Sequence, residues 1–174
     1  MASTELAAKI EYEKLLSSND IFDIDKMLLV IEQFLAKYPN YSRALRLRGI
    51  LIDSTISIDE KNGIQVLDDK RNILILNDFT AAFAADNEFT LVLIDIGDYW
   101  FERNCFAKAI EFYDKAIHLL DQGHFSDSYD EELELAYKGK IMSLVELGDL
   151  NTAEMCRNEA KQRKALGEGD IHDE

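Results

Sequence analysis

The chain has 174 residues, of which 47% are hydrophobic, and its 19 basic and 34 acidic side chains leave a formal net charge of −15 at pH 7. That length and apolar content suffice for one domain with its own core, and no apolar run is long enough to span a membrane. The negative charge disfavours nucleic acid and anionic lipid and favours a basic protein or peptide. Because the start of the chain lacks the basic and apolar regions of a secretion signal, we expect a cytoplasmic protein.

Two helices are predicted before Pro39, the one proline of the chain. The first covers residues 3–16 with Ser3 or Thr4 as its cap, and the second covers residues 25–38. The apolar stripe of the first helix is Leu6, Ile10 and Leu15. That of the second is Met27, Ile31, Phe34 and Leu35. We expect these two helices to pack as an antiparallel pair, since each has one apolar face.

The next pair is interrupted by an insertion. Leu45, Gly49 and Ile52 give residues 42–53 a large, small, large pattern at helical spacing. The partner helix carries Ile75, Phe79, Ala82 and Phe83 and closes at a turn over residues 85–87. Between these helices, residues 54–69 are diluted in Ser, Asp, Asn and Gly, so we expect an insertion there.

Residues 90–123 contain the clearest pattern in the chain. A first helix carries Leu93, Ile96, Gly97 and Trp100, and a second carries Ala109, Tyr113, Ala116 and Ile117. A turn at Asn104 and Cys105 separates them. Small side chains on both helices allow a close antiparallel approach, and large ones fill the space between the helices.

This window resembles a tetratricopeptide repeat, whose helix pair needs small and large side chains at these positions. The resemblance is weaker elsewhere in the chain. It implies an all-α fold in which about four antiparallel helix pairs form a right-handed superhelix, an α-solenoid. Such arrays act as binding scaffolds rather than enzymes, so the resemblance implies protein–protein interaction.

A fourth pair is predicted to start near Glu134, after about ten extra residues, 124–133, that form a loop or a helix extension. Its pattern consists of Tyr137, Ile141, Leu144, Ala153 and Ala160. Arg157 stands where a large aromatic is usual in the repeat, and a polar outer face suits a terminal capping helix. We expect residues 1–166 to form a single helical domain and residues 167–174 to form a flexible acidic tail.

No catalytic motif is present. The sequence has no glycine-rich phosphate loop, nucleophile elbow or paired-cysteine metal motif, so we expect neither enzymatic activity nor a cofactor. The one grouping with metal-ligand chemistry is His118, Asp121, His124 and Asp127. A helix end and a loop would not bring these four side chains together, so we expect no metal site. The two cysteines, Cys105 and Cys156, are too few for a disulfide scaffold, and a disulfide between them is disfavoured.

In tetratricopeptide arrays the first helix of each pair lines a concave face, and the resemblance therefore implies a binding groove. Its residues would be Arg43, Arg46, Ile50, Leu91, Ile94, Asp98, Phe101, Leu135, Lys138 and Met142, with Glu102 beside them. We expect Phe101 to be the main anchor, because its own helix pair does not need it. The alternative is that Leu91, Ile94 and Phe101 pack against the rest of the chain and leave no open groove. Asparagines of the chaperone-binding carboxylate clamp are replaced here by Ile50, Asp98 and Met142, so that role is not implied.

The sequence thus predicts a non-enzymatic module that binds and sequesters one basic protein partner, as a dedicated chaperone or as an immunity-type inhibitor of a toxin. The acidic excess is concentrated in residues 88–174, which hold 20 acids and 9 bases. A surface of this sign speeds encounter with a basic partner. The alternative function is an assembly scaffold that joins two or more protein partners. The identity of the partner and the oligomeric state stay open.

Overall fold

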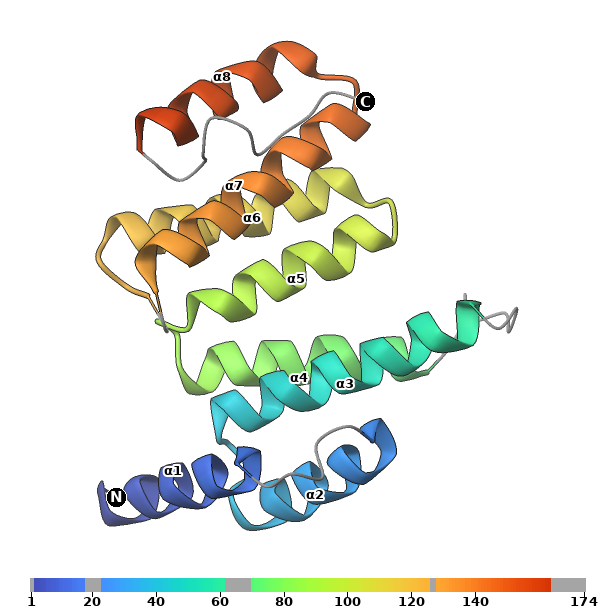
Figure 1. The fold of residues 1–174 in the computed structure, drawn as a ribbon, viewed down its shortest axis with the longest axis vertical. Coiled ribbons are helices and arrows are strands. Elements are labelled where there is room, and N and C mark those ends of the chain that lie inside the picture. Colours follow the sequence, from blue (N-terminus) through green and yellow to red (C-terminus); the bar gives the residue numbers. More distant parts are fainter. Residues whose placement is uncertain (1, 18–22, 62–69, 126–127, 164–174) are drawn as a thin grey trace. The chain divides into compact units, whose positions relative to one another are not determined.

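The computed structural model describes residues 2–17, 23–61, 70–125 and 128–163, which form eight helices and no strand (Figure 1). The predicted all-α class is confirmed for these residues. The helices are α1 (Ala2–Leu16), α2 (Ile24–Lys37), α3 (Ser42–Lys61), α4 (Arg71–Ala85), α5 (Thr90–Glu102), α6 (Phe106–Asp121), α7 (Tyr129–Glu146) and α8 (Leu150–Gln162). They divide into two compact units, an N-terminal unit of residues 1–86 and a C-terminal unit of residues 87–174. The predicted acidic tail, 167–174, lies outside the described residues.

Helix α2 has the predicted core face. Met27, Ile31, Phe34 and Leu35 are all buried. The helix begins after Asp23, whose carboxylate accepts a hydrogen bond from the backbone N–H of Lys26 at 3.2 Å. A capping carboxylate satisfies one of the N–H groups that the first helical turn leaves without a partner.

The predicted face of α1 is wrong. Leu6 and Ile10 are 59% and 58% exposed, and the helix is buried instead at Ala8 and Tyr12. The ring of Tyr12 lies 5.6 Å from that of Phe34, centroid to centroid, and its hydroxyl donates to the backbone carbonyl of Arg43 at 3.1 Å. Burying one aromatic ring can stabilise a fold more than burying two aliphatic side chains, so α1 packs with its Tyr12 side toward the core. The predicted caps are also wrong, because Ser3 and Thr4 lie inside the helix.

Helix α3 continues to Lys61, eight residues beyond its predicted end, so the first half of the expected insertion is helical. The hydroxyls of Ser54 and Thr55 donate to carbonyls one turn earlier in the same helix, which lets these polar residues stay within it. An ion pair joins this extension to α4, because the guanidinium of Arg71, at the start of α4, lies 2.6 Å from the carboxylate of Asp59. Residues 62–69 of the expected insertion lie outside the described residues.

Helices α3 and α4 pack closely, as predicted. Ile75, Phe79 and Ala82 of α4 are buried. A Cβ atom at Gly49 would lie 2.6 Å from the ring of Phe79, so only glycine allows this approach of the two helices. A buried ion pair adds to the contact, because Arg48 of α3 donates two hydrogen bonds to Asp78 of α4, at 2.7 and 2.5 Å.

Breaking this ion pair should destabilise the fold. We expect Arg48→Met to lower the free energy of unfolding by about 2–3 kcal/mol, because it leaves the buried carboxylate of Asp78 without its cation. The expected loss is below the roughly 3–5 kcal/mol of a fully buried pair, since the Arg48 side chain is 29% exposed. Urea unfolding followed by circular dichroism measures it. Lys14→Met, which removes an exposed charge from α1 of the same unit, is the control, and equal losses in the two variants would contradict the role of the ion pair.

The C-terminal unit begins with the pair α5 and α6, which starts at Thr90 and turns at Asn104 and Cys105 as the sequence predicted. Leu93, Ile96, Gly97, Ala109, Tyr113, Ala116 and Ile117 are buried as expected. Trp100 is only partly buried, because its neighbour Tyr99 takes the core position. The two rings meet edge to face at 5.2 Å, and the ammonium of Lys108 lies 4.1 Å from the Trp100 ring centroid. A left-handed Asn104, with φ of 56°, makes the turn between the helices.

Helix α7 begins at Tyr129, five residues before the predicted start of the fourth pair. The extra residues therefore include a helix extension, which Ser128 caps by accepting from the backbone N–H of Glu131 at 3.5 Å. This additional turn buries Glu132 and Leu133. Helix α8 packs on α7 through Ala153, Cys156 and Ala160, which are buried as the repeat pattern requires.

Candidate functional site

Helices α5 and α7 lie side by side because one aromatic ring from α6 fits between them. A Cβ atom at Gly97 of α5 would lie 2.5 Å from the ring of Tyr113, and one at Gly139 of α7 would lie 2.3 Å from it. Both positions therefore need glycine, and the ring contacts both helices at once. The sequence pattern predicted Gly97 but missed Gly139, whose one signal is a glycine inside a helical pattern.

The hydroxyl of Tyr113, a residue that is 1% exposed, is hydrogen-bonded to α5. It donates to the carboxylate of Asp98 on α5 at 2.6 Å, and Asp98 itself is exposed. Burial, and then the negative charge of Asp98, raise the pKa of Tyr113. The tyrosine thus remains a hydrogen-bond donor at neutral pH and fixes the carboxylate beside Gly139.

A second contact joins the first turns of the same two helices. The hydroxyl of Thr90, at the start of α5, donates to the carboxylate of Glu132 in the first turn of α7, and both side chains are buried. The Tyr113 ring contacts Gly97 and Gly139, near the middle of each helix. The two contacts therefore follow the same order along α5 and α7, so these helices run parallel. Helices α5 and α7, from successive pairs, are therefore adjacent.

The outward face of α7 carries the predicted residues Leu135, Lys138 and Met142, and Val145 beside them. Leu135, Met142 and Val145 are 49%, 51% and 37% exposed. Their spacing places them on one face, together with Lys138, whose ammonium pairs with Glu134 at 2.5 Å. This face is an exposed apolar stripe with an ion pair at its middle. The carboxylate of Asp98 lies next to it, because Gly139 is one turn from both Leu135 and Met142.

The residues predicted on α5 divide into three groups. Asp98 and Glu102 are exposed, and Leu91 is partly buried. Ile94 was predicted to contact a partner, but it is only 3% exposed and belongs to the core, because α7 covers that side of α5. The expectation that its own helix pair does not need Phe101 is also wrong, because the ring is partly buried and meets that of Phe106 of the same pair edge to face, at 5.4 Å between centroids.

The remaining predicted residues lie in the N-terminal unit. Arg43 is exposed on α3, while Arg46 and Ile50 are partly buried there. In the C-terminal unit, the structure brings together one surface, which we call the α5–α7 surface. It consists of Asp98, Glu102, Leu135, Lys138, Met142 and Val145.

Within the described ranges, the structure shows no group of three or more His, Cys, Asp or Glu side chains that could hold a metal ion. The imidazole of His118 lies 3.0 Å from the Gln122 amide, and that of His124 lies 3.5 Å from Glu88. Asp127, the fourth member of the predicted grouping, is outside the described residues. Both cysteines are free thiols. None of the described helices combines the length and the apolar character that crossing a membrane requires.

Comparison with known proteins does not assign this chain to a family. No family model matches it, and no curated protein does. Among solved structures, it is similar to a crystal structure of MamA protein, at 17% sequence identity over 96% of this chain and 98% of that one, with a TM-score of 0.33. This similarity is too low to transfer a family or a function from one protein to the other.

Proposed function

We propose that this protein is a tetratricopeptide-like module that binds a single basic protein partner through the α5–α7 surface. The observation that carries the proposal is the exposed stripe of Leu135, Met142 and Val145 on α7. Exposed apolar side chains along one helix face, with acidic groups near them, are typical of interaction surfaces. The partner would place apolar anchors on the stripe and basic groups beside Asp98 and Glu102.

The negative net charge of the chain supports a basic partner. Net charge over the chain is −15, and most of the excess lies in the C-terminal unit that contains this surface. Such a field attracts a basic protein before contact and raises its association rate constant. Sequestering a basic partner, as a dedicated chaperone or as a toxin inhibitor, is the role that this combination favours.

A second candidate function has one observation in its favour. Leu6, Ile10 and Leu29 of the N-terminal unit are all more than half exposed, at 59%, 58% and 56%. A scaffold that joins two partners would need an apolar surface outside the α5–α7 surface, and these residues could supply it.

The number of partners distinguishes the two functions. We expect affinity capture of the tagged protein in its native host to yield one stoichiometric basic protein. With that purified partner, the association rate constant should fall by roughly tenfold or more when salt is raised from about 0.05 to 0.5 M. Surface plasmon resonance measures this rate. Several partners with distinct binding sites would favour the scaffold, and an association rate independent of salt would contradict the charge argument.

A further inference from the structure

Helix α8 is attached to the rest of the C-terminal unit by few apolar atoms. Its buried side chains are Ala153, Cys156 and Ala160, all small. By contrast, α6 buries Tyr113, Ile117 and Leu120 together with two alanines. Because hydrophobic stabilisation grows with the apolar area removed from water, α8 gains much less from packing than α6 does.

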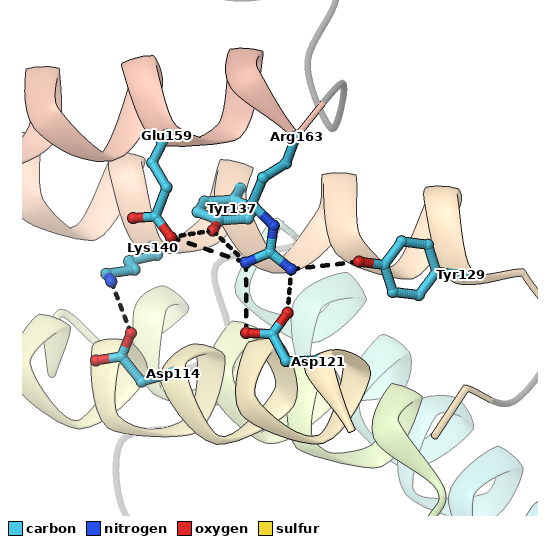
Figure 2. A network of polar contacts seen from close by, with 7 residues as sticks. All are labelled: Asp114, Asp121, Tyr129, Tyr137, Lys140, Glu159 and Arg163. Atoms are coloured by element: carbon cyan, nitrogen blue, oxygen red, sulfur yellow. Dashed lines mark hydrogen bonds and ion pairs between the residues drawn. The ribbon is translucent and has the colours of Figure 1, made fainter. Parts of the chain in front are cut away.

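Polar contacts at the C-terminal end of α8 also hold this helix to α6 and α7. Arg163, the residue that ends the helix, pairs with Asp121 of α6 and donates to the hydroxyls of Tyr137 and Tyr129 of α7, at 2.8 and 3.3 Å (Figure 2). The Tyr137 hydroxyl in turn donates to Glu159 of α8 at 2.7 Å. We call these five residues the Arg163 clasp. One guanidinium thus connects three helices, and charge-assisted hydrogen bonds are stronger than neutral ones.

The opposite end of α8 has the features of a hinge. Gly148, between α7 and α8, has a φ of +76°, and a Cβ atom there would meet nothing within 4 Å. The turn is therefore open to solvent on that side. After it, the carboxylate of Asp149 caps α8 by accepting from the backbone N–H of Thr152 at 3.2 Å, while its own backbone N–H donates to the carbonyl of Leu144 in α7 at 3.0 Å. The turn therefore stays on α7, and α8 would rotate about the residues that join the two, Gly148 and Asp149.

From this arrangement we propose that α8 is a latched helix, which opens as a unit about the Gly148 turn when the Arg163 clasp releases. In the closed state the side chains of Tyr137 and Cys156 are 0% and 4% exposed. Opening would expose both and uncover a second face of α7, away from the α5–α7 surface. Local opening below the free energy of global unfolding is common for elements with few apolar contacts.

Cys156 provides a direct probe of opening. Burial raises the pKa of its thiol to about 11, so the closed state is unreactive toward thiol reagents near pH 8. In a Cys105→Ser background, Cys156 is the one thiol of the chain. Trp100, the one tryptophan, reports global unfolding of the unit from α5.

The experiment measures the rate of Cys156 labelling by a thiol reagent as a function of urea, beside unfolding followed by Trp100 fluorescence. We expect labelling in low urea to depend on urea much less steeply than Trp100 unfolding, since opening α8 exposes far less surface. We also expect Arg163→Met to raise the labelling rate by roughly tenfold or more. Lys161→Met, which removes an exposed charge from the same last turn, is the matched control.

Two results would overturn the proposal. Equal urea dependence of labelling and of Trp100 unfolding, already in the Cys105→Ser protein, would mean that α8 does not open separately. Equal labelling rates in Arg163→Met and Lys161→Met would mean that the clasp is not the latch.

Discussion

Replacing Tyr113 by alanine is expected to lower the free energy of unfolding by about 3–5 kcal/mol, as for other fully buried aromatic side chains. The ring is 1% exposed and fills the space that Gly97 and Gly139 leave between α5 and α7. Its removal leaves a cavity shared by three helices and takes away the hydrogen bond to Asp98. Urea unfolding followed by Trp100 fluorescence measures the loss.

Gly139→Ala is the control for Tyr113→Ala, because Gly139 contacts the Tyr113 ring. In a helix interior, Gly→Ala ordinarily stabilises by up to about 1 kcal/mol. Here the added methyl group would meet the Tyr113 ring at 2.3 Å, so we expect Gly139→Ala to destabilise by about 1–3 kcal/mol. In the Tyr113→Ala background the same change should stabilise instead. If Gly139→Ala stabilises the parent protein, the ring does not lie between the helices.

Much of the fold could be predicted, because helical periodicity is a local property of the sequence. The faces of α2 and α6 were predicted correctly, since in each case several large apolar residues recur on one side, whereas α5 was predicted only in part, because Ile94 and Tyr99 are buried there and Trp100 is not. In α1 the pattern failed. Leu6 and Ile10 form an apolar stripe on their own, but the contact of Tyr12 with Phe34 of α2 and with Tyr41, in the turn before α3, decides which side is buried.

Less of the candidate site could be predicted. The repeat register placed Leu135 and Met142 on the outward face of α7, where the structure has them exposed. The register could not distinguish Ile94, which α7 covers, from Leu91, three residues earlier. Burial at such positions depends on how closely the next helix approaches, and that distance is set by Gly139, far away in the sequence. The superhelical arc and the single domain predicted over residues 1–166 remain predictions.

If the α5–α7 surface binds the protein partner, Met142, which is 51% exposed on the apolar stripe of α7, lies in the contact. Replacing Met142 by arginine would put a positive charge into an apolar contact with a basic protein, where like charges repel. Such a like-charge contact costs several kcal/mol, about 3 or more, which corresponds to a loss of affinity of roughly a hundredfold or more. Met155→Arg adds the same charge at a methionine that is 65% exposed on α8, outside this surface.

Isothermal titration calorimetry with the captured partner, on Met142→Arg and Met155→Arg side by side, tests this claim most directly. Circular dichroism of each variant checks that the fold is intact. We expect Met142→Arg to weaken the affinity for the partner by about a hundredfold or more, and Met155→Arg to change it by less than about threefold. Equal affinities in the two variants, with both folded, would contradict the claim and place the binding site elsewhere on the protein.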